Sequence, residues 1–482
     1  MLYLKLMKLD DAKKIVFEKK PAFATLYNEW GNTTWTEYAD KNYPKKAVTE
    51  LPEEFLEAFR NVLNSSLDES TVTTALATLQ KTNFVSTADH HGILCHPFFS
   101  NNTILRSSRE DAVISLTCGG ISLTNSSYPR GIFFHDKNLN EIRMPFVSRK
   151  TGNLPVYGHE PITKKQLQSH KKMARFMDIS KQARKNLMIF FDALVTDEKM
   201  WELASLSDQF TRINSILWHQ LFGEGKNLIY VSCEDVVREL LLKIHLVKKT
   251  PMHDLLFDPS VRERYIENFN GITGAHSGQE YGTHFFWHIK HEHHTRVPLW
   301  IHGDELVSPD NHVKISFDTG SITQGLNHRT LLPSTALCYS ILSFYYGLTL
   351  GGGFSQIQYL GEMKEAYEKT VHHPEKESDH SEPFDYSQGK LREGSQSEIQ
   401  TNIFTGECVQ LGLTDGKKTV PATLFDILLW NRGDITQLYE SFKTAPLQAS
   451  LDLMMPEYVQ IVTGKRPVIS DLPEIPKTLY VD

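Results

Sequence analysis

The stretch Asn83-Phe-Val-Ser-Thr-Ala-Asp89-His90-His91-Gly92-Ile-Leu-Cys95-His96-Pro97 indicates the fold of this chain, because a short apolar run leads directly into a polar loop. Residues 83–88 predict a strand, since aromatic and β-branched side chains stand next to one another there. Gly92 lets the backbone turn sharply, and Pro97 suits the first position of a helix. The stretch therefore predicts a strand, a histidine-rich loop and a helix in succession.

Similar apolar runs predict further strands at residues 112–117, 131–135, 227–232, 297–301 and 312–317. Helical patterns separate several of them, and Ser232 can cap a helix over residues 234–246. Strands that alternate with helices favour an α/β core with a mainly parallel sheet. Such sheets bind ligands beyond the carboxyl ends of their strands, so the loop after residue 88 is a candidate site.

The sequence pattern divides the chain into six parts. We expect a helical N-terminal region (1–80), the first half of the α/β core (81–159), a helical insertion (160–225), the second half of the core (226–369), a polar loop or linker (370–400) and a helical C-terminal region (401–482). The linker is rich in Glu, Ser, His and Gly, which is typical of segments that do not form a core.

The composition of the 482 residues argues against several classes of protein. A formal net charge of −7 argues against a general nucleic-acid binder and against binding to anionic membranes. No stretch approaches the roughly 20 apolar residues that cross a bilayer. The five cysteines are widely spread and odd in number, so we expect no disulfide framework and a cytoplasmic location.

The loop after residue 88 supplies the first candidate site. We expect its catalytic residues to be Asp89, His90, His91 and His96. Histidine transfers protons near neutral pH, and its N–H groups can stabilise phosphate oxygens or a developing negative charge. Backbone N–H groups at the start of the following helix would also favour an anion, with Asn102 adding a polar group one turn further on. The arrangement predicts a pocket for a nucleotide or another phosphorylated group.

Two other interpretations of this loop stay open. The consecutive Asp, His and His resemble the Asp-His-His motif of a phosphoesterase family, which also needs upstream aspartates that this sequence does not place at strand ends. A divalent metal site would then use Asp89, His90, His91 and His288. In the third interpretation, His90 and His91 satisfy buried backbone groups and have no chemical role.

A second histidine-rich stretch spans residues 284–294. As a strand it would place His284, Phe286 and His288 on one face, and as a helix it would align His284, His288 and His291. No spacing here matches a zinc signature, and the histidine-rich turn at its end is expected to be solvated surface. Residues beside apolar neighbours should be better ordered and are our candidates for substrate binding: Thr283, His284, Trp287 and Arg296.

The third candidate is a glycine run that follows an apolar segment and opens a helix. Glycines permit close approach of the backbone to a ligand, and a helix start favours an anion. We expect the substrate to contact Gly351, Gly352, Gly353 and Gln356. Arg329 could bind a carboxylate or phosphate through two N–H groups, or could form a structural salt bridge.

Two patches of the sequence resemble a known family, the bacillithiol cysteine-adding enzymes (cysteine ligases). Thr87-Ala-Asp89-His90-His91-Gly92, followed by His96-Pro97, is similar to that family's Thr-Gly-Gln-Gln-x-Gly loop and its following Gly-Pro. Leu331-Leu-Pro333-Ser-Thr and Gly351-Gly-Gly-Phe-Ser-Gln356-Ile-Gln-Tyr359 are similar to its Leu-Leu-Pro-Thr stretch and its Gly-Gly-Pro-x-Glu-x-x-Tyr segment. The family's glutamines correspond to Asp89 and His90, and its glutamate corresponds to Gln356.

This resemblance implies a Rossmann-like core with inserted helical segments. It also implies an enzyme that joins an amino acid to a sugar-linked acceptor through a C–N bond. The pocket at the strand ends would accept a nucleotide-like or sugar-phosphate-like molecule.

We therefore expect a cytoplasmic, histidine-rich enzyme of small-molecule biosynthesis, a ligase or transferase that forms a C–N bond between an amino acid or amine and a phosphorylated or sugar-like molecule. Asp89 would orient a histidine or hold the substrate amine, and Arg329 would bind an anionic end. Replacing His91 by Ala would then abolish turnover and leave the fold intact. A nucleotide is a candidate cofactor, and the oligomeric state stays open.

Two alternatives belong to other functional classes. One is a metal-dependent hydrolase that uses the histidine clusters and a divalent metal. The other is a non-enzymatic binding or effector protein, in which the polar segment 370–400 recruits a partner.

Overall fold

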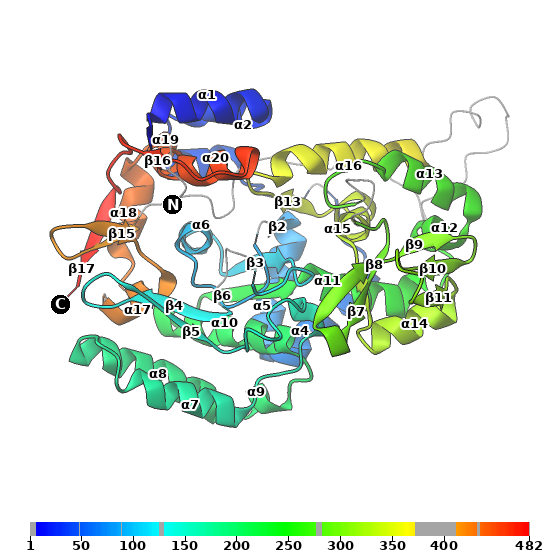
Figure 1. The fold of residues 1–482 in the computed structure, drawn as a ribbon, viewed down its shortest axis with the longest axis horizontal. Coiled ribbons are helices and arrows are strands. Elements are labelled where there is room, and N and C mark those ends of the chain that lie inside the picture. The colour runs from blue at the N-terminus through cyan, green and yellow to red at the C-terminus, as the bar shows by residue number, and fades with distance from the viewer. Residues whose placement is uncertain are drawn as a thin grey trace.

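The computed structural model describes residues 6–47, 49–87, 89–124, 130–275, 282–371, 411–430 and 434–481. At its centre lies a sheet of four parallel strands, shown with the surrounding helices in Figure 1. In spatial order the strands are β13 (Thr349–Gly351), β2 (Phe84–Ser86), β3 (Ala112–Thr117) and β6 (Asn227–Ser232). The predicted α/β class and a parallel sheet are confirmed for this part of the chain.

The central sheet separates two hydrophobic cores, because successive strand side chains point to opposite faces. Phe84, Val113 and Leu228 belong to one core, with side chains of α6 (Pro97–Ser107) and α10 (Leu206–Phe222). Val85, Ile114 and Ile229 belong to the other, with side chains of α4 (Glu53–Ser66), α5 (Glu69–Thr82) and α11 (Cys233–Leu240). Coverage of both faces explains why these strands are buried at every position.

The order of the strands reverses between β2 and β13. From β2 the chain continues to β3 and then to β6 on one side, whereas β13 pairs with the other side of β2. In open parallel sheets, the point where the order reverses opens a crevice at the carboxyl ends of the strands. The loops that follow β2 and β13 flank this point.

Most of the other strands form small antiparallel sheets, so the predicted strands at 131–135, 297–301 and 312–317 do not extend the parallel one. Short turns join most of the paired strands, as antiparallel neighbours allow, whereas β12 reaches β7 after a long connection. These sheets contain the hairpin of β4 (Gly131–His135) and β5 (Glu141–Pro145), the group of β7 (Phe286–Lys290), β8 (Thr295–Pro298) and β12 (Leu331–Pro333), and the group of β9 (Trp300–His302), β10 (Glu305–Val307) and β11 (Lys314–Ser316).

The first eighty residues contain helices, as do the residues between β5 and β6. Thr163 begins one of them with a capping box, since its side chain accepts from the backbone N–H of Gln166 while the Gln166 side chain accepts from Thr163. The helices of these two regions, besides α4, α5 and α10, are α1 (Leu9–Lys19), α2 (Pro21–Trp30), α3 (Trp35–Asn42), η1 (Val156–Gly158), α7 (Lys164–Ala174), α8 (Lys181–Thr196) and α9 (Lys199–Glu202).

Between β6 and residue 371 the chain is again mainly helical. The predicted helix at 234–246 is present as α11 and a π-helical continuation. The segments of this part are η2 (Leu241–His245), α12 (Pro251–Phe257), α13 (Pro259–Phe269), η3 (His291–His293), α14 (Thr319–Asn327), α15 (Thr335–Tyr339), η4 (Ser340–Tyr345) and α16 (Gln356–Val371). From residue 372 on, the predicted linker at 370–400 lies outside the described residues.

The C-terminal region combines helices with strands that the sequence analysis did not predict. β1 (Leu6–Met7) pairs with β16 (Val468–Ile469), so the start of the described chain lies beside the C-terminal region. The other elements here are β14 (Leu411–Thr414), β15 (Thr419–Pro421), α17 (Leu424–Trp430), α18 (Thr436–Thr444), α19 (Leu447–Leu453), α20 (Met455–Thr463) and β17 (Lys477–Tyr480). None of the helices in the described residues combines the length and the apolar character that crossing a bilayer requires.

Candidate functional site

The loops that follow β2 and β13 touch each other at the carboxyl end of the sheet. The Thr87 N–H donates to the Gly351 carbonyl at 3.0 Å. The Gln356 amide donates to the Thr87 carbonyl at 2.7 Å and accepts from the Thr87 hydroxyl at 2.9 Å. The structure thus brings together the first histidine-rich loop and the glycine run, although they are far apart in the sequence.

The glycines in this contact are needed for space. A Cβ atom on Gly352 would approach the Gln356 side chain to 2.9 Å, closer than real Cβ contacts. Gly351 is the last residue of β13 and pairs with Ser86 of β2. Within the described residues, these glycines bring protein backbone and Gln356 close together.

The loop after β2 crosses the end of β3. His90 and Cys118 form a parallel β-bridge. The Cys118 N–H donates to the Asp89 carbonyl at 2.8 Å, and the His91 N–H donates to the Cys118 carbonyl at 3.0 Å. These bonds fix Asp89 and His90 directly above the carboxyl ends of β2 and β3.

Asp89 is the most unusual acid of this edge. Its side chain is only 4% exposed, and its Oδ1 has no hydrogen-bond partner among the described residues. Burial raises the pKa of Asp89 to about 7, against the opposing effects of a hydrogen bond with Tyr230 and the positive charge of Arg106. Near neutral pH this carboxyl can therefore both accept and release a proton.

His91 is held on both sides of its ring and is 1% exposed. Nε2 lies 2.9 Å from the Ser207 carbonyl, and Nδ1 lies 2.6 Å from the Thr117 hydroxyl. Because a carbonyl only accepts, Nε2 carries a proton, while the Thr117 hydroxyl lies within hydrogen-bond distance of both Nδ1 and the Val231 carbonyl. Burial lowers the pKa of His91, in agreement with a neutral ring. The geometry thus makes His91 part of the framework, as the third interpretation of the loop expected.

The neighbouring residues His90 and His96 are partly buried, and the Nδ1 atoms of their rings are inaccessible to water. Burial lowers the pKa of His90 to about 4 and that of His96 to about 3, with the charge of Arg143 as a further cause for His96. Both rings are uncharged at neutral pH, so any contact of theirs with an anion would use a neutral N–H group. Asn102 lies on α6, but its side chain is outside the described part of the structure.

The turn after β3 is occupied by a carboxylate of the protein itself. Glu234, which follows β6, accepts from the N–H groups of Gly119 at 2.7 Å and Gly120 at 2.8 Å. The hydroxyl of Ser232 donates to the same carboxylate at 2.7 Å. Paired backbone N–H groups in such a turn form an anion site, and here the chain fills it. The sequence analysis missed Glu234.

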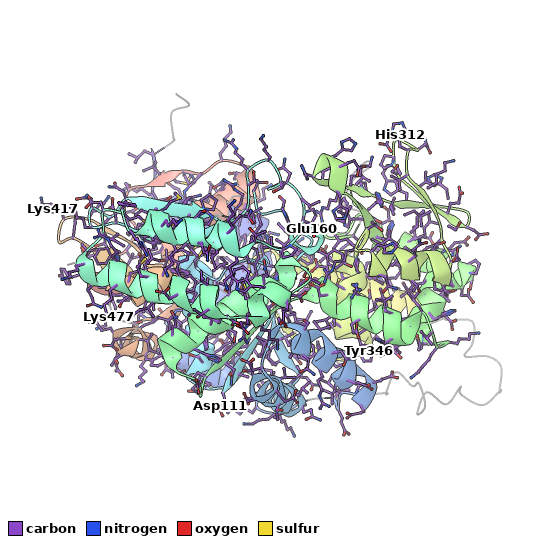
Figure 2. The ribbon with its side chains drawn as sticks, turned by 90° about the horizontal axis from the view of Figure 1, so that it is seen from below. Asp111, Glu160, His312, Tyr346, Lys417 and Lys477 are labelled. Atoms are coloured by element: carbon purple, nitrogen blue, oxygen red, sulfur yellow. The ribbon has the colours of Figure 1, made fainter. Side chains whose placement is uncertain are left out.

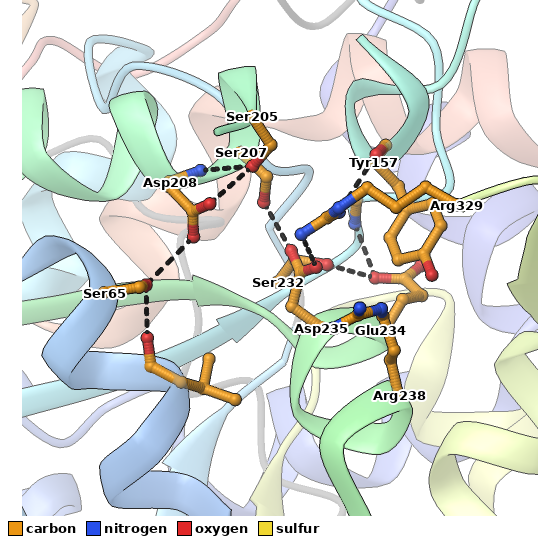
Figure 3. Close-up of polar contacts among 12 residues, drawn as sticks. Ser65, Tyr157, Ser205, Ser207, Asp208, Ser232, Glu234, Asp235, Arg238 and Arg329 are labelled. Atoms are coloured by element: carbon orange, nitrogen blue, oxygen red, sulfur yellow. Dashed lines mark hydrogen bonds and ion pairs between the residues drawn. The ribbon is translucent and has the colours of Figure 1, made fainter. Parts of the chain in front are cut away.

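Asp235, the next residue, connects the loop to Arg329 (Figure 3). Arg329 Nη2 lies 2.7 Å from Asp235 Oδ1, and the Ser207 hydroxyl donates to Asp235 Oδ2 at 2.6 Å. Arg329 Nη1 donates to the Tyr157 carbonyl at 3.1 Å. Since His91 bonds the Ser207 carbonyl, a continuous polar chain runs from His91 to Arg329. Arg329 thus forms the structural salt bridge that the sequence left open.

The hairpin β7–β8 brings Arg296 to the same edge. Arg296 Nη1 donates to the Gly120 carbonyl at 2.7 Å, and its guanidinium lies 4.0 Å from the centre of the Trp287 ring. The other candidates of this stretch lie at the base of the hairpin. Thr283 donates to the Leu299 carbonyl at 2.6 Å, and the His284 carbonyl accepts from Ser334 at 2.7 Å.

The histidine-rich turn at the end of this hairpin is solvated surface in part, with the His293 side chain 69% exposed. His288 lies on β7, paired with Leu331 and Val297. Across the described ranges, no three side chains of His, Cys, Asp or Glu are grouped as a metal ion requires. The alternative set of Asp89, His90, His91 and His288 is therefore not assembled in this structure.

Three cysteines, Cys118, Cys233 and Cys338, meet at this edge. Their spacing along the chain did not indicate this cluster. Cys118 and Cys233 directly follow the paired residues Thr117 and Ser232 of neighbouring strands. Hydrogen bonds link Cys118 to Cys233 and Cys233 to Cys338. These bonds and burial raise the pKa of the Cys118 thiol well above its usual value, so the cluster consists of neutral thiols.

Comparison with known proteins adds no assignment. No model of a known protein family matches the chain, and no curated protein sequence matches it. The function must therefore be argued from the geometry of this edge.

Proposed function

We propose that the chain is a Rossmann-like enzyme of the ligase or transferase type, which forms a C–N bond between an amino acid or other amine and a phosphorylated or sugar-like small molecule. One observation carries the proposal: Asp89, buried with an unpaired oxygen, stands where the loops after β2 and β13 meet.

The order of the strands supports a Rossmann-like core. Along the chain, the strands of the sheet follow one another as β2, β3, β6 and β13 and can be numbered 1 to 4. Across the sheet, their order from β6 to β13 is then 3-2-1-4. The order 3-2-1-4 is part of the order found in dinucleotide-binding sheets, which place their ligand at the reversal point. The site residues Thr87, Asp89 and Gln356 flank this point.

The properties of Asp89 suit the proton transfer that C–N bond formation needs. The amine nitrogen attacks an electrophilic carbon of the second substrate, the bond from that carbon to its leaving group breaks, and the nitrogen loses a proton. A base is most effective when its pKa lies near the working pH, and the pKa of Asp89 is about 7. The unpaired Oδ1 is the atom that would accept the proton.

Arg296 supports an anionic partner for the amine. Its guanidinium lies at the Gly120 carbonyl, beside the end of β3, and carries a positive charge to the edge where Asp89 is buried. Guanidinium groups bind phosphate and carboxylate through paired N–H donors. Arg296 is thus the candidate contact for the phosphorylated or acidic substrate.

The proposal is tested in two steps. First, the melting temperature of the protein is measured with nucleotides, amino acids and sugar phosphates, each with and without a chelator, because a ligand that binds the native state raises it. Pairs of compounds that bind are then incubated with the protein, and mass spectrometry detects a product in which an amine is joined to the second compound.

The Asp89→Asn variant is the decisive comparison. The neutral amide resembles the protonated carboxyl that burial favours, so the variant should fold and bind the same compounds. We expect its turnover to fall at least about 100-fold, because a general base is removed. Asp178→Asn, an exposed carboxylate paired with Lys137, is the matched control. If no pair of compounds reacts, or if Asp89→Asn reacts as fast as the control, the proposal is wrong.

A further inference from the structure

A cavity of about 690 Å³ lies beside the polar chain that ends at Arg329. Its walls are formed by residues that follow β5, by the two residues before α10, by residues at the turn η3 and by the two residues after α14. Figure 2 shows Glu160 from this cavity near the middle of the molecule, with His312 of the β10–β11 turn on one side and Lys417 on the other. The volume is within the range of small-molecule sites, which is about 300–1,000 Å³.

Nitrogen-containing side chains dominate the polar part of this lining. The nitrogen-containing side chains that line the cavity include His159, His291, His294, His328 and Arg329. Glu160 is the sole carboxylate among the described lining residues. Phe146, Val147, Leu154 and Ile162 add apolar surface. Such a cavity suits a small organic molecule with one anionic group.

His159 offers a buried acceptor to that molecule. The residue is 7% exposed, its ring donates to the backbone carbonyls of Leu154 and Thr151, and its Nε2 has no partner among the described residues. The donor is therefore Nδ1–H, and Nε2 carries a lone pair. A buried polar atom without a partner is energetically unfavourable, so a ligand hydroxyl or amine that donates to Nε2 would be favoured.

Arg329 supplies the charge for an anion. Its contacts with Asp235 and the Tyr157 carbonyl use one N–H of each terminal nitrogen. A guanidinium has five N–H donors, so further donors stay available for phosphate oxygens. Tyr157 stacks on the guanidinium at 4.7 Å and holds its plane in place.

We propose that this cavity binds a small phosphate monoester, with the phosphate at Arg329 and the surrounding imidazoles and a ligand hydroxyl or amine at His159 Nε2. This binding does not depend on catalysis at Asp89. The site would thus exist whether or not the chain is a group-transfer enzyme.

The test compares phosphate esters with their uncharged parents by isothermal titration calorimetry at pH 7. The probes are ribose 5-phosphate, glycerol 3-phosphate and adenosine 5′-monophosphate, against ribose, glycerol and adenosine. We expect at least one ester to bind at least tenfold more tightly than its parent. If every ester binds no better than its parent, the proposal is overturned.

Three variants locate the binding. His159→Phe removes the acceptor and should weaken binding of the ester about tenfold. Ala204→Trp adds bulk at an exposed position of the wall, so it should fold normally and block the cavity. Glu160→Gln removes the carboxylate and should tighten binding severalfold.

The outcomes separate this proposal from the one at the sheet edge. Asp89→Asn should bind the ester as the unchanged protein does, since Asp89 does not line this cavity. If Ala204→Trp binds the ester with unchanged affinity, the ester binds elsewhere and the cavity proposal is overturned. Because Ala204 is exposed, this result holds even if His159→Phe fails to fold.

Discussion

The two histidine-rich stretches have similar compositions, but the turn that ends the second contrasts with the first in its environment. In the first, the His91 side chain is 1% exposed and bonded at both nitrogens, and burial lowers the pKa values of His90 and His96. In the second, the turn η3 ends a hairpin, and the His293 side chain is 69% exposed. The first stretch follows a central parallel strand, whereas the second joins two antiparallel strands. The position of a stretch relative to the sheet, and not its histidine content, sets its environment.

The strongest test of this comparison is His91→Ala. The variant removes the two hydrogen bonds of the ring, with the Ser207 carbonyl and the Thr117 hydroxyl, and opens a cavity in the core. We expect the free energy of unfolding to fall by about 3–5 kcal/mol. Differential scanning calorimetry measures the change, and His312→Ala, with an 80% exposed side chain, is the control.

This outcome differs from what a catalytic His91 predicts. A catalytic role would leave the melting temperature near that of the control and remove turnover alone. If His91 supports the fold, the His91→Ala variant has a lower melting temperature, and its turnover falls only in proportion to the unfolded fraction. An unchanged melting temperature with lost turnover would restore His91 to the catalytic residues.

The pH dependence of stability gives a smaller and more specific effect. The pKa of His96 is about 3 in the folded chain and about 6.5 when the ring is exposed, so between these values the unfolded chain binds an extra proton. The contribution of His96 to the free energy of unfolding is therefore lost as the pH falls below about 6.5. Asp89 has the opposite effect on the free energy of unfolding, because its raised pKa lets the folded chain keep a proton up to about pH 7. Its contribution therefore falls as the pH rises toward that value.

His96→Gln removes only the contribution of this ring. Between pH 6.5 and pH 4.5, the free energy of unfolding of the variant should rise relative to that of the unchanged protein by on the order of 2 kcal/mol. Melting curves at the two pH values measure the gain, and His96→Asn should show the same one. A difference that stays constant with pH would mean that the ring is solvated in the folded chain.

The smallest effect is expected in the second stretch. His293→Ala removes an exposed ring whose nearest charged partner, Glu292, is 3.9 Å away. The free energy of unfolding should change by less than about 0.5 kcal/mol. A larger loss in a denaturant titration would show that the turn is packed as firmly as the first stretch.

The sequence predicted the features that depend on local pattern. Apolar runs identified β2, β3 and β6. The rule that ligands bind at strand ends selected Asp89, the glycine run selected Gly351, and the structure brings both to one edge. The same rule could have selected Glu234 and Asp235, because they directly follow the predicted strand 227–232.

The features that the sequence could not predict depend on which strands become neighbours. Cys118 and Cys233 meet only because β3 and β6 pair in register. His159 is a single histidine between Gly158 and Glu160, so no pattern indicated its buried ring. The short strands β14, β15 and β17 support one another by pairing, although each is too short to give a clear periodicity.

The contact between Thr87 and Gly351 joins positions 264 residues apart, and this sets the order of events during synthesis. A ribosome that has made β2 must add all the intervening residues before β13 emerges to cover its open edge. Until then, the emerging polypeptide exposes strand backbone that can pair with other chains. A chaperone that shields β2 would therefore have its greatest effect during the synthesis of the residues between β2 and β13.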